Sequence, residues 1–131
     1  MKYLLDTNVL VELVKNNTIV RQEASNAGLG NCAISEITLA EMMYGAYKGG
    51  MERHYHEIVF LQENLEVLPI GPSISGFARL KADSESKGCR LDNFDLLSAA
   101  TAITSNMTLV THNTRHFERI PGLKLIDWEQ P

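Results

Sequence analysis

The sequence predicts an α/β fold built on a parallel sheet of about five strands with crossover helices. Short apolar runs alternate along the chain with longer segments whose apolar residues recur at helical spacing, a pattern typical of this fold class. Glycines stand at several breaks, among them Gly28, Gly49, Gly50 and Gly88, as they do where helices end. No repeat, linker or low-complexity tract divides the 131 residues. Residues 1–131 are therefore expected to form a single domain.

Five short segments are expected to form the strands. They are three to five residues long, mostly apolar, and lie between segments with a helical pattern. In chain order they are residues 3–5, 31–34, 65–69, 108–111 and 124–126.

The longer segments between these strands carry helix signals. Ser35 and Asp92 are favoured N-cap residues just before two of them, and Gly88 follows a third. The expected helices are residues 9–15, 19–27, 36–48, 51–64, 73–87 and 93–105. The last helix is apolar or small on nearly every face, so it is expected to be buried on several sides.

The composition excludes several classes of protein. With 44% hydrophobic and 21% charged residues, the chain is expected to be an ordinary soluble protein. No apolar run approaches the roughly 20 residues of a membrane span, and the N-terminus lacks a signal-peptide layout, so we expect a cytoplasmic protein. Cys32 and Cys89 are isolated and expected to be reduced. A net charge of −4 argues against nucleic-acid binding by bulk electrostatics but leaves a local site open.

The first candidate site residue is Asp6, which closes the first predicted strand. Ligands of parallel α/β sheets bind outside the carboxyl ends of the strands, where the following helices begin, and Asp6 is placed there. Aspartate is also a favoured N-cap whose charge suits a helix N-terminus, and Thr7 and Asn8 are further potential caps. Asp6 alone is therefore explained more simply as a cap, and a site requires other acids at the same edge.

Glu41 lies just over one turn into the helix predicted after the second strand. Its neighbours on that helix face are Thr38, Gly45 and Lys48, which form a small, polar stripe on a helix expected to be mostly buried. The stripe is either a solvated face or the wall of a site. Glycine inside a helix costs roughly 1 kcal/mol relative to alanine, so Gly45 slightly favours a site that something approaches closely.

Asp95 lies in the first turn of the helix predicted over residues 93–105. With Asp92 as N-cap, Asp95 occupies the third helical position, which resembles a capping box. Two acids in a first turn are each stabilised by the helix dipole, and this is a sufficient structural explanation. Because the helix is expected to be buried on several sides, Asp95 would nevertheless face the carboxyl edge of the sheet.

Polar residues also follow the fourth predicted strand, in the stretch TLVTHNTRHF. Thr111, Asn113 and His116 are candidates because they stand at the same sheet edge. His112 and His116 have the spacing of the two ligands in the zinc motif HExxH, but its glutamate is missing and no third ligand is evident. Zinc binding is therefore disfavoured. The sequence also lacks a GxSxG, a Walker P-loop and a GxGxxG motif.

Four stretches together resemble the PIN-domain ribonucleases, most closely the VapC-type toxins of type II toxin–antitoxin pairs. They are LLDTNVLVEL, SEITLAEMMYGA, LDNFDLLSAATA and LVTHNTRHFERIPGLKLIDW, in the family's order and spacing, and the resemblance runs from Lys2 to Trp128. It implies a PIN-like three-layer α/β/α sandwich around a parallel sheet of about five strands. It further implies a cluster of acids at the carboxyl edge that binds Mg²⁺ or Mn²⁺ and cleaves RNA.

The resemblance assigns the main site residues. The family's first three acids fall on Asp6, Glu41 and Asp95. Its fourth acid, just before the phenylalanine of the last motif, falls on His116. This departure leaves open whether one metal ion or two are held.

Supporting roles follow for residues near these positions. Asn113 or Asp92 could supply an oxygen ligand or hold a metal-bound water. Thr7 and Thr111, with Asn113, would position waters or the scissile phosphate, and Arg115 is the nearest candidate to contact the RNA backbone.

The expected chemistry is hydrolysis assisted by a metal ion. Three converging carboxylates raise one another's pKa unless a cation lies among them, and oxygen donors without cysteine favour Mg²⁺ or Mn²⁺ over zinc. Asp6 and Asp95 are expected to bind the ion directly, and Glu41 directly or through a water that it orients. A metal-bound water would attack the phosphodiester in line, and the resemblance implies 3′-hydroxyl and 5′-phosphate products.

The resemblance also implies partners, namely a VapB-like antitoxin that blocks the acidic crevice and a second copy of the chain. Met42, Met43, Tyr44 and Tyr47 could line such an interface. Methionine and tyrosine at helical spacing are, however, more often part of the core.

Two other functions remain as alternatives. A catalytically weakened PIN-fold binding module is suggested by His116 at the fourth acidic position. A phosphohydrolase that forms an aspartyl-phosphate on Asp6 is disfavoured, because the second aspartate of such enzymes is Asn8 here.

Overall fold

The computed structural model describes residues 2–130 and confirms the predicted α/β class. The strands in this range are all parallel and form one sheet in the order β3-β2-β1-β4-β5. They are β1 (Tyr3–Leu5), β2 (Cys32–Ser35), β3 (Glu66–Leu68), β4 (Thr108–Val110) and β5 (Lys124–Ile126). Each coincides with a predicted strand, and the ends differ by one residue at most.

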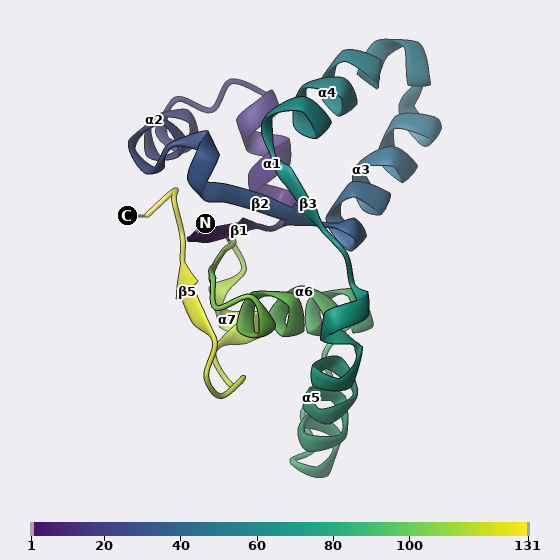
Figure 1. Cartoon of the computed structure of the whole chain (residues 1–131), viewed down its shortest axis with the longest axis vertical. Coiled ribbons are helices and arrows are strands. Elements are labelled where there is room, and N and C mark those ends of the chain that lie inside the picture. The colour runs from purple at the N-terminus through teal and green to yellow at the C-terminus, as the bar shows by residue number, and fades with distance from the viewer. Residues whose placement is uncertain (1, 131) are drawn as a thin grey trace.

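Helices cover both faces of this sheet and confirm the expected three-layer α/β/α sandwich. Figure 1 shows α1 to α4 on one side of the sheet and α5 to α7 on the other. The helices are α1 (Thr7–Val14), α2 (Thr18–Ala27), α3 (Glu36–Gly49), α4 (Met51–Asn64), α5 (Ile74–Ser86), α6 (Asn93–Thr104) and α7 (Thr114–Phe117), with short 3₁₀ turns η1 (Leu29–Asn31) and η2 (Gly71–Ser73).

The core is divided by the sheet into two clusters. Successive strand residues point to opposite faces. Accordingly, Leu5 and Val110 pack in the cluster under α1 and α2, whereas Leu4 and Leu109 pack in the cluster under α6. Each such fully buried leucine contributes about 1.5–3 kcal/mol to stability. The two clusters hold the strands in place, so the strand ends that carry the candidate site form a rigid edge.

Two local differences from the prediction concern helix boundaries. α1 begins at Thr7 rather than at residue 9, because Asp6 caps it directly after β1. The one-turn helix α7 was not expected, since a helix of four residues is too short to show a periodic pattern. Its Phe117 is buried in the cluster under α6.

α3 is more exposed than predicted. Its buried residues are Ile37, Thr38 and Ala46, and the side chains of Tyr44 and Tyr47 are 66% and 71% exposed. These tyrosines are not core residues, so that interpretation was wrong. The physical reason is visible in Figure 1, where α3 and α4 form a hairpin that extends beyond the sheet and leaves the far half of α3 covered on one side only.

Two further predictions concern membranes and cysteines. Within residues 2–130, no helix combines the length and the apolar character needed to cross a membrane. Cys32 and Cys89 are free thiols, as predicted. Burial raises the pKa of Cys32 to about 11, which keeps this thiol protonated and unreactive at neutral pH.

Candidate active site

Asp6 lies at the centre of the candidate site, at the carboxyl end of β1. β1 pairs with β4 so that Leu5 lies opposite Val110, which places the residues that follow, Asp6 and Thr111, side by side. The Asp6 side chain is 8% exposed. Its Oδ1 accepts a hydrogen bond from the Thr7 backbone N–H (3.0 Å), and its Oδ2 accepts one from Thr111 Oγ1 (3.0 Å). Asp6 is therefore both a helix cap, as the simpler explanation held, and a carboxylate oriented at the sheet edge.

Thr111 is buried, and its hydroxyl group makes all the hydrogen bonds that it can form. Oγ1 accepts from Asn8 Nδ2 (3.3 Å) and from the Asn113 backbone N–H (3.1 Å). A hydroxyl oxygen has two acceptor positions and one proton. Because both acceptor positions are filled, the single proton points at Asp6.

Glu41 reaches the same edge from the second turn of α3. Its Oε1 accepts a hydrogen bond of 2.7 Å from Thr7 Oγ1, a short distance typical of a charge-assisted bond. Ser35 caps α3 by accepting from the Thr38 N–H, as predicted, and so fixes where the helix begins. Thr7 thus connects Asp6, through its backbone, to Glu41, through its hydroxyl.

Asp95 and Asp92 come to this edge from the N-terminus of α6. Asp92 is the N-cap and accepts a 2.7 Å bond from the Phe94 N–H, with Asp95 in the first turn, as predicted. His116 of α7 places Nδ1 3.8 Å from Asp95 Oδ2, and its side chain is 61% exposed. This distance exceeds that of a hydrogen bond, so His116 and Asp95 are loosely paired.

The pKa values of the three main carboxyl groups are shifted first by burial and, in Glu41 and Asp95, also by neighbouring acids. Burial is the largest cause that raises the pKa of each of them, Asp6, Glu41 and Asp95. The charges of Asp6, Asp95 and Asp92 raise the pKa of Glu41 further, and those of Asp6 and Asp92 raise that of Asp95. Hydrogen bonds from Thr7 to Asp6 and Glu41 oppose these increases. The fold thus brings the predicted acids to one edge, where the charge of Asp6 raises the pKa of both Glu41 and Asp95.

A groove opens beside this acidic edge, between α1, α3 and α4. Its volume is about 330 Å³, and Thr7, Glu41 and Gly45 contribute to its wall. A Cβ atom added at Gly45 would meet no atom within 4 Å. Packing within the described residues therefore does not require glycine at this position. A larger cavity of about 670 Å³ lies between α1, α2 and α4, away from the acids.

The donor set fits a hard divalent cation. Asp6, Glu41 and Asp95 supply only carboxylate oxygens, which are the ligands that hard divalent cations prefer. Within residues 2–130, however, no three His, Cys, Asp or Glu side chains already stand close enough to coordinate one ion. The chemistry of the donors fits, while the coordination shell itself is not formed in advance.

The supporting residues differ in whether they contact the main acids. Thr7 and Thr111 contact the main acids directly, whereas Asn113 reaches Thr111 only through its backbone, and Arg115 is an exposed residue of α7. His112 lies outside α7 and pairs with Asp127. The two histidines of the HExxH-like spacing therefore do not share a helix, in agreement with the argument against zinc.

Sequence reasoning missed two residues that organise the site. Asn8 was considered as a cap and as the position of a phosphohydrolase's second aspartate, but its side chain bonds to Thr111 and to the backbone of His112. His112 was considered only as a zinc ligand. The one signal in the sequence was that Asn8 and His112 lie shortly after a strand end, next to candidate site residues. This signal does not distinguish a hydrogen-bond partner from an ordinary loop residue.

Comparisons with known proteins agree with this geometry. A PIN domain family model matches residues 3–123. The chain is 33% identical over 130 residues to the tRNA(fMet)-specific endonuclease VapC of Shigella flexneri, with 98% of each chain covered. A structure of VapBC2 from Rickettsia felis bound to a promoter DNA fragment superposes with a TM-score of 0.89 at 33% identity, covering 98% of this chain and 99% of that one. For DNA-bound VapBC from Salmonella typhimurium the TM-score is 0.91 at 32% identity, with 98% of each chain covered. The chain therefore belongs to the PIN domain family and, within it, to the VapC ribonucleases.

Proposed function

We propose that this protein is a Mg²⁺- or Mn²⁺-dependent endoribonuclease that acts as the toxin of a toxin–antitoxin pair. The observation that carries the proposal is the gathering of Asp6, Glu41 and Asp95 at one sheet edge, where burial raises the pKa of all three and neighbouring acids raise those of Glu41 and Asp95 further. Membership of the VapC ribonucleases supports the reaction class, and the carboxylate donors support the metal.

Asp6 and Asp95 would hold the cation directly, and Glu41 directly or through water. A bound Mg²⁺ or Mn²⁺ supplies a more acidic water and neutralises charge on the phosphate oxygens. Thr7 occupies Oε1 of Glu41, and we assign the other oxygen, Oε2, to orient the attacking water. His116 stands where a fourth acid is expected, so we leave the number of ions, one or two, to metal titration.

The rim of the acidic edge supports RNA as the substrate. Phe94, directly before Asp95 in α6, is 46% exposed, and aromatic rings at such positions stack unpaired bases. Arg115 is exposed on α7 and would contact a phosphate of the RNA backbone. These features favour a single-stranded region of RNA over a paired one.

A small antitoxin and a second copy of the chain are the proposed partners. The groove at Glu41 and the larger cavity are neighbours that share the lining residues Val14 and Glu57, and we assign both to an extended antitoxin segment. The exposed Tyr44 and Tyr47 on α3 offer apolar surface for either partner. We place the protein in the cytoplasm, where an RNA substrate and an antitoxin would both be present, and treat residues 1–131 as one domain.

The proposal is tested by comparing the wild type with Asp6→Asn. We expect purified wild type to cut RNA with Mg²⁺ or Mn²⁺, to lose activity with EDTA, and to be toxic when expressed without an antitoxin. Asp6→Asn should lose both activity and toxicity, by a factor on the order of 10²–10³ or more, without unfolding. Asp83→Asn, at an exposed ion pair on α5, is the control and should behave as wild type.

Each contrary result has a defined meaning. RNA binding without cleavage in any divalent cation would establish the alternative, a PIN-fold binding module, which His116 favours. Phosphate release from a general phosphatase substrate without RNA cleavage would establish the phosphohydrolase instead. Equal toxicity of Asp6→Asn and wild type would remove Asp6 from the metal site.

A further inference from the structure

The segment that follows β5 packs beside the acidic edge. Trp128 is 2% exposed in the cluster under α1 and α2, and its ring lies 5.9 Å from that of Tyr3, centroid to centroid. Burial of a tryptophan in this way anchors the chain firmly. The neighbours Asp127 and Glu129 are therefore held at defined positions on the surface next to β1 and α1.

Asp127 is paired with His112, the residue after Thr111. Its Oδ1 lies 3.0 Å from His112 Nδ1 and also accepts a 2.9 Å bond from the Glu129 N–H. The pair is largely shielded from water, with side-chain exposures of 17% for His112 and 18% for Asp127. Because Asp127 can only accept, Nδ1 of His112 must carry the proton that joins them.

Glu129 lies near the other nitrogen of the same imidazole ring. His112 Nε2 is buried without a hydrogen-bond partner among the described residues and lies 3.5 Å from Glu129 Oε1. Asn17, after α1, donates to Glu129 (3.1 Å) and to Glu12 (3.0 Å). The segment is thus attached to the far end of α1 as well as to His112.

A continuous set of hydrogen bonds connects this pair to the metal-binding carboxylate. The backbone N–H of His112 donates to Asn8 Oδ1 (3.3 Å), and Asn8 Nδ2 donates to Thr111 Oγ1 (3.3 Å). Thr111 Oγ1 in turn donates to Asp6 Oδ2 (3.0 Å). Because Asn8 Oδ1 accepts from the His112 N–H, the orientation of the Asn8 amide is fixed. Because Thr111 Oγ1 accepts from Asn8 and from the Asn113 N–H, its own proton must point at Asp6.

We propose that Asp127 and His112 are positioning residues which, through Asn8 and Thr111, hold the Asp6 carboxylate in the orientation that binds the metal ion. This inference rests on the proposed function and extends its metal site to the C-terminal segment. Groups that hydrogen-bond a ligating side chain orient it and alter metal affinity, typically by 10- to 100-fold when they are removed. Without the Asp127–His112 pair, the backbone at His112 and the side chain of Asn8 lose their fixed geometry. Thr111 Oγ1 then loses the hydrogen bond from Asn8, which is one of the two that direct its proton.

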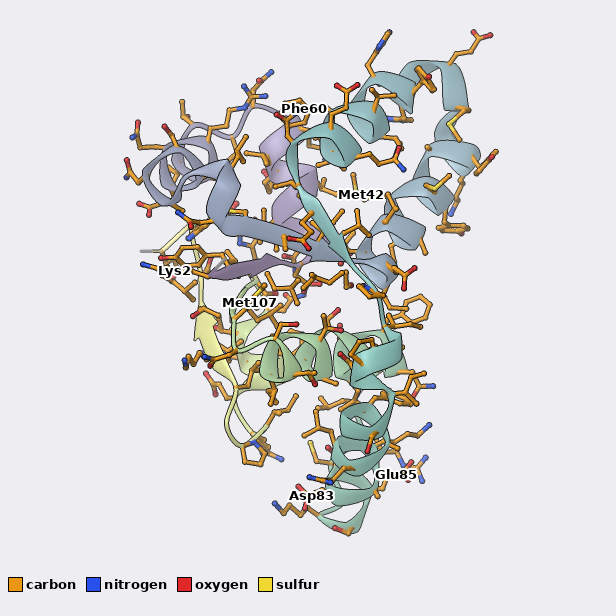
Figure 2. The ribbon with its side chains drawn as sticks, in the orientation of Figure 1. Lys2, Met42, Phe60, Asp83, Glu85 and Met107 are labelled. Atoms are coloured by element: carbon orange, nitrogen blue, oxygen red, sulfur yellow. The ribbon has the colours of Figure 1, made fainter. Side chains whose placement is uncertain are left out.

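The experiment measures Mn²⁺ affinity of the full chain by calorimetry, together with thermal stability. We expect Asp127→Ala and His112→Ala to weaken Mn²⁺ binding roughly tenfold at temperatures where both variants remain folded. His112→Asn should retain near wild-type affinity, because the Asn amide nitrogen can take the place of Nδ1 as donor to Asp127. Asp83→Ala, which removes the same type of side chain from an exposed ion pair, is the matched control. Figure 2 shows Asp83 at the distal end of α5, away from the sheet.

The possible outcomes separate this inference from the proposed function. If wild type binds Mn²⁺, Asp6→Asn does not, and Asp127→Ala binds as wild type, the metal site stands and the positioning role is overturned. A loss of thermal stability without a change in affinity means a purely structural role and also overturns it. Equal losses in His112→Ala and His112→Asn contradict the hydrogen-bond mechanism. Absence of Mn²⁺ binding by wild type overturns the metal site and this inference together.

Discussion

The inner and the outer half of the acidic site are built differently. The inner half, Asp6 with Thr7, Asn8 and Thr111, is largely buried, and both Asp6 oxygens accept hydrogen bonds from its neighbours. The outer half is Asp92, Asp95 and His116, which are more exposed. Its contact between Asp95 and His116 spans 3.8 Å.

The inner half is therefore held more firmly than the outer half. Moving a buried hydrogen-bonded group is costly, because leaving its partner without a hydrogen bond costs about 1–3 kcal/mol of stability. An exposed pair can rearrange at little cost, since exposed ion pairs contribute about 0–1 kcal/mol.

The largest effect is expected for Thr111→Val, which breaks the inner half. Valine has a similar shape but leaves Asp6 Oδ2, Asn8 Nδ2 and the Asn113 N–H without their partner. The free energy of unfolding should fall by about 1–3 kcal/mol, measured by denaturant titration, and Mn²⁺ affinity should fall with it. Thr111→Ser keeps the hydroxyl and should lose less than half as much. An equal loss in both variants would show that the methyl group, not the hydroxyl, matters.

The pH dependence of stability tests the carboxyl groups of both halves, together with that of Glu41. A carboxyl whose pKa is raised by folding binds more protons in the folded than in the unfolded state, so stability falls as pH rises through the interval between the two values. For Asp6, Glu41 and Asp95 this interval begins near the ordinary values, 3.8 for Asp and 4.5 for Glu. Metal-free protein should therefore lose stability from these groups as pH rises above that range, and Mn²⁺ should restore it. Melting curves of wild type and Asp6→Asn, with and without Mn²⁺, measure the difference; a slope identical in the two proteins would contradict it.

Gly45→Ala extends the comparison to the groove beside Glu41. A Cβ atom at this helical position meets open space, so alanine should raise the free energy of unfolding by about 0.5–1 kcal/mol. The added methyl group also narrows the groove, so activity or antitoxin binding should decrease although the protein becomes more stable. Higher stability with unchanged activity and unchanged binding would show that nothing approaches the backbone there.

The smallest effect on stability is expected for His116→Ala, in the outer half. The side chain is 61% exposed and only loosely paired with Asp95, so the free energy of unfolding should change by no more than about 0.5 kcal/mol. His116→Asp, which supplies the fourth carboxylate, should strengthen Mg²⁺ binding measured by calorimetry. A large loss of stability in His116→Ala would mean that the outer half is as rigid as the inner half.

Local sequence patterns were sufficient to predict the order of the strands and of the longer helices, and they made the main acids candidates. The strands were recognised because each is a short apolar run, and α3 and α6 because Ser35 and Asp92 cap them as their side chains favour. Asp6 at a strand end and Asp95 in a first turn were candidates by position, since parallel strands all end at one edge of a sheet. Glu41, in the second turn of α3, was assigned together with them by the resemblance of the motifs. These features depend on neighbours within a few residues along the chain, and a sequence carries that information directly.

The contacts between distant segments could not be predicted in the same way. Asp127 and His112 are 15 residues apart, and His112 and Asn8 are 104 apart, so neither pair has a local pattern. Tyr44 and Tyr47 have a helical spacing compatible with a core or with a surface, and only the extension of the α3–α4 hairpin beyond the sheet left them exposed. The sequence alone therefore identified the acids that are candidates for the sheet edge. Only the fold showed that Asp6 is the one with both oxygens hydrogen-bonded, because hydrogen bonding and burial depend on partners that are distant in the chain.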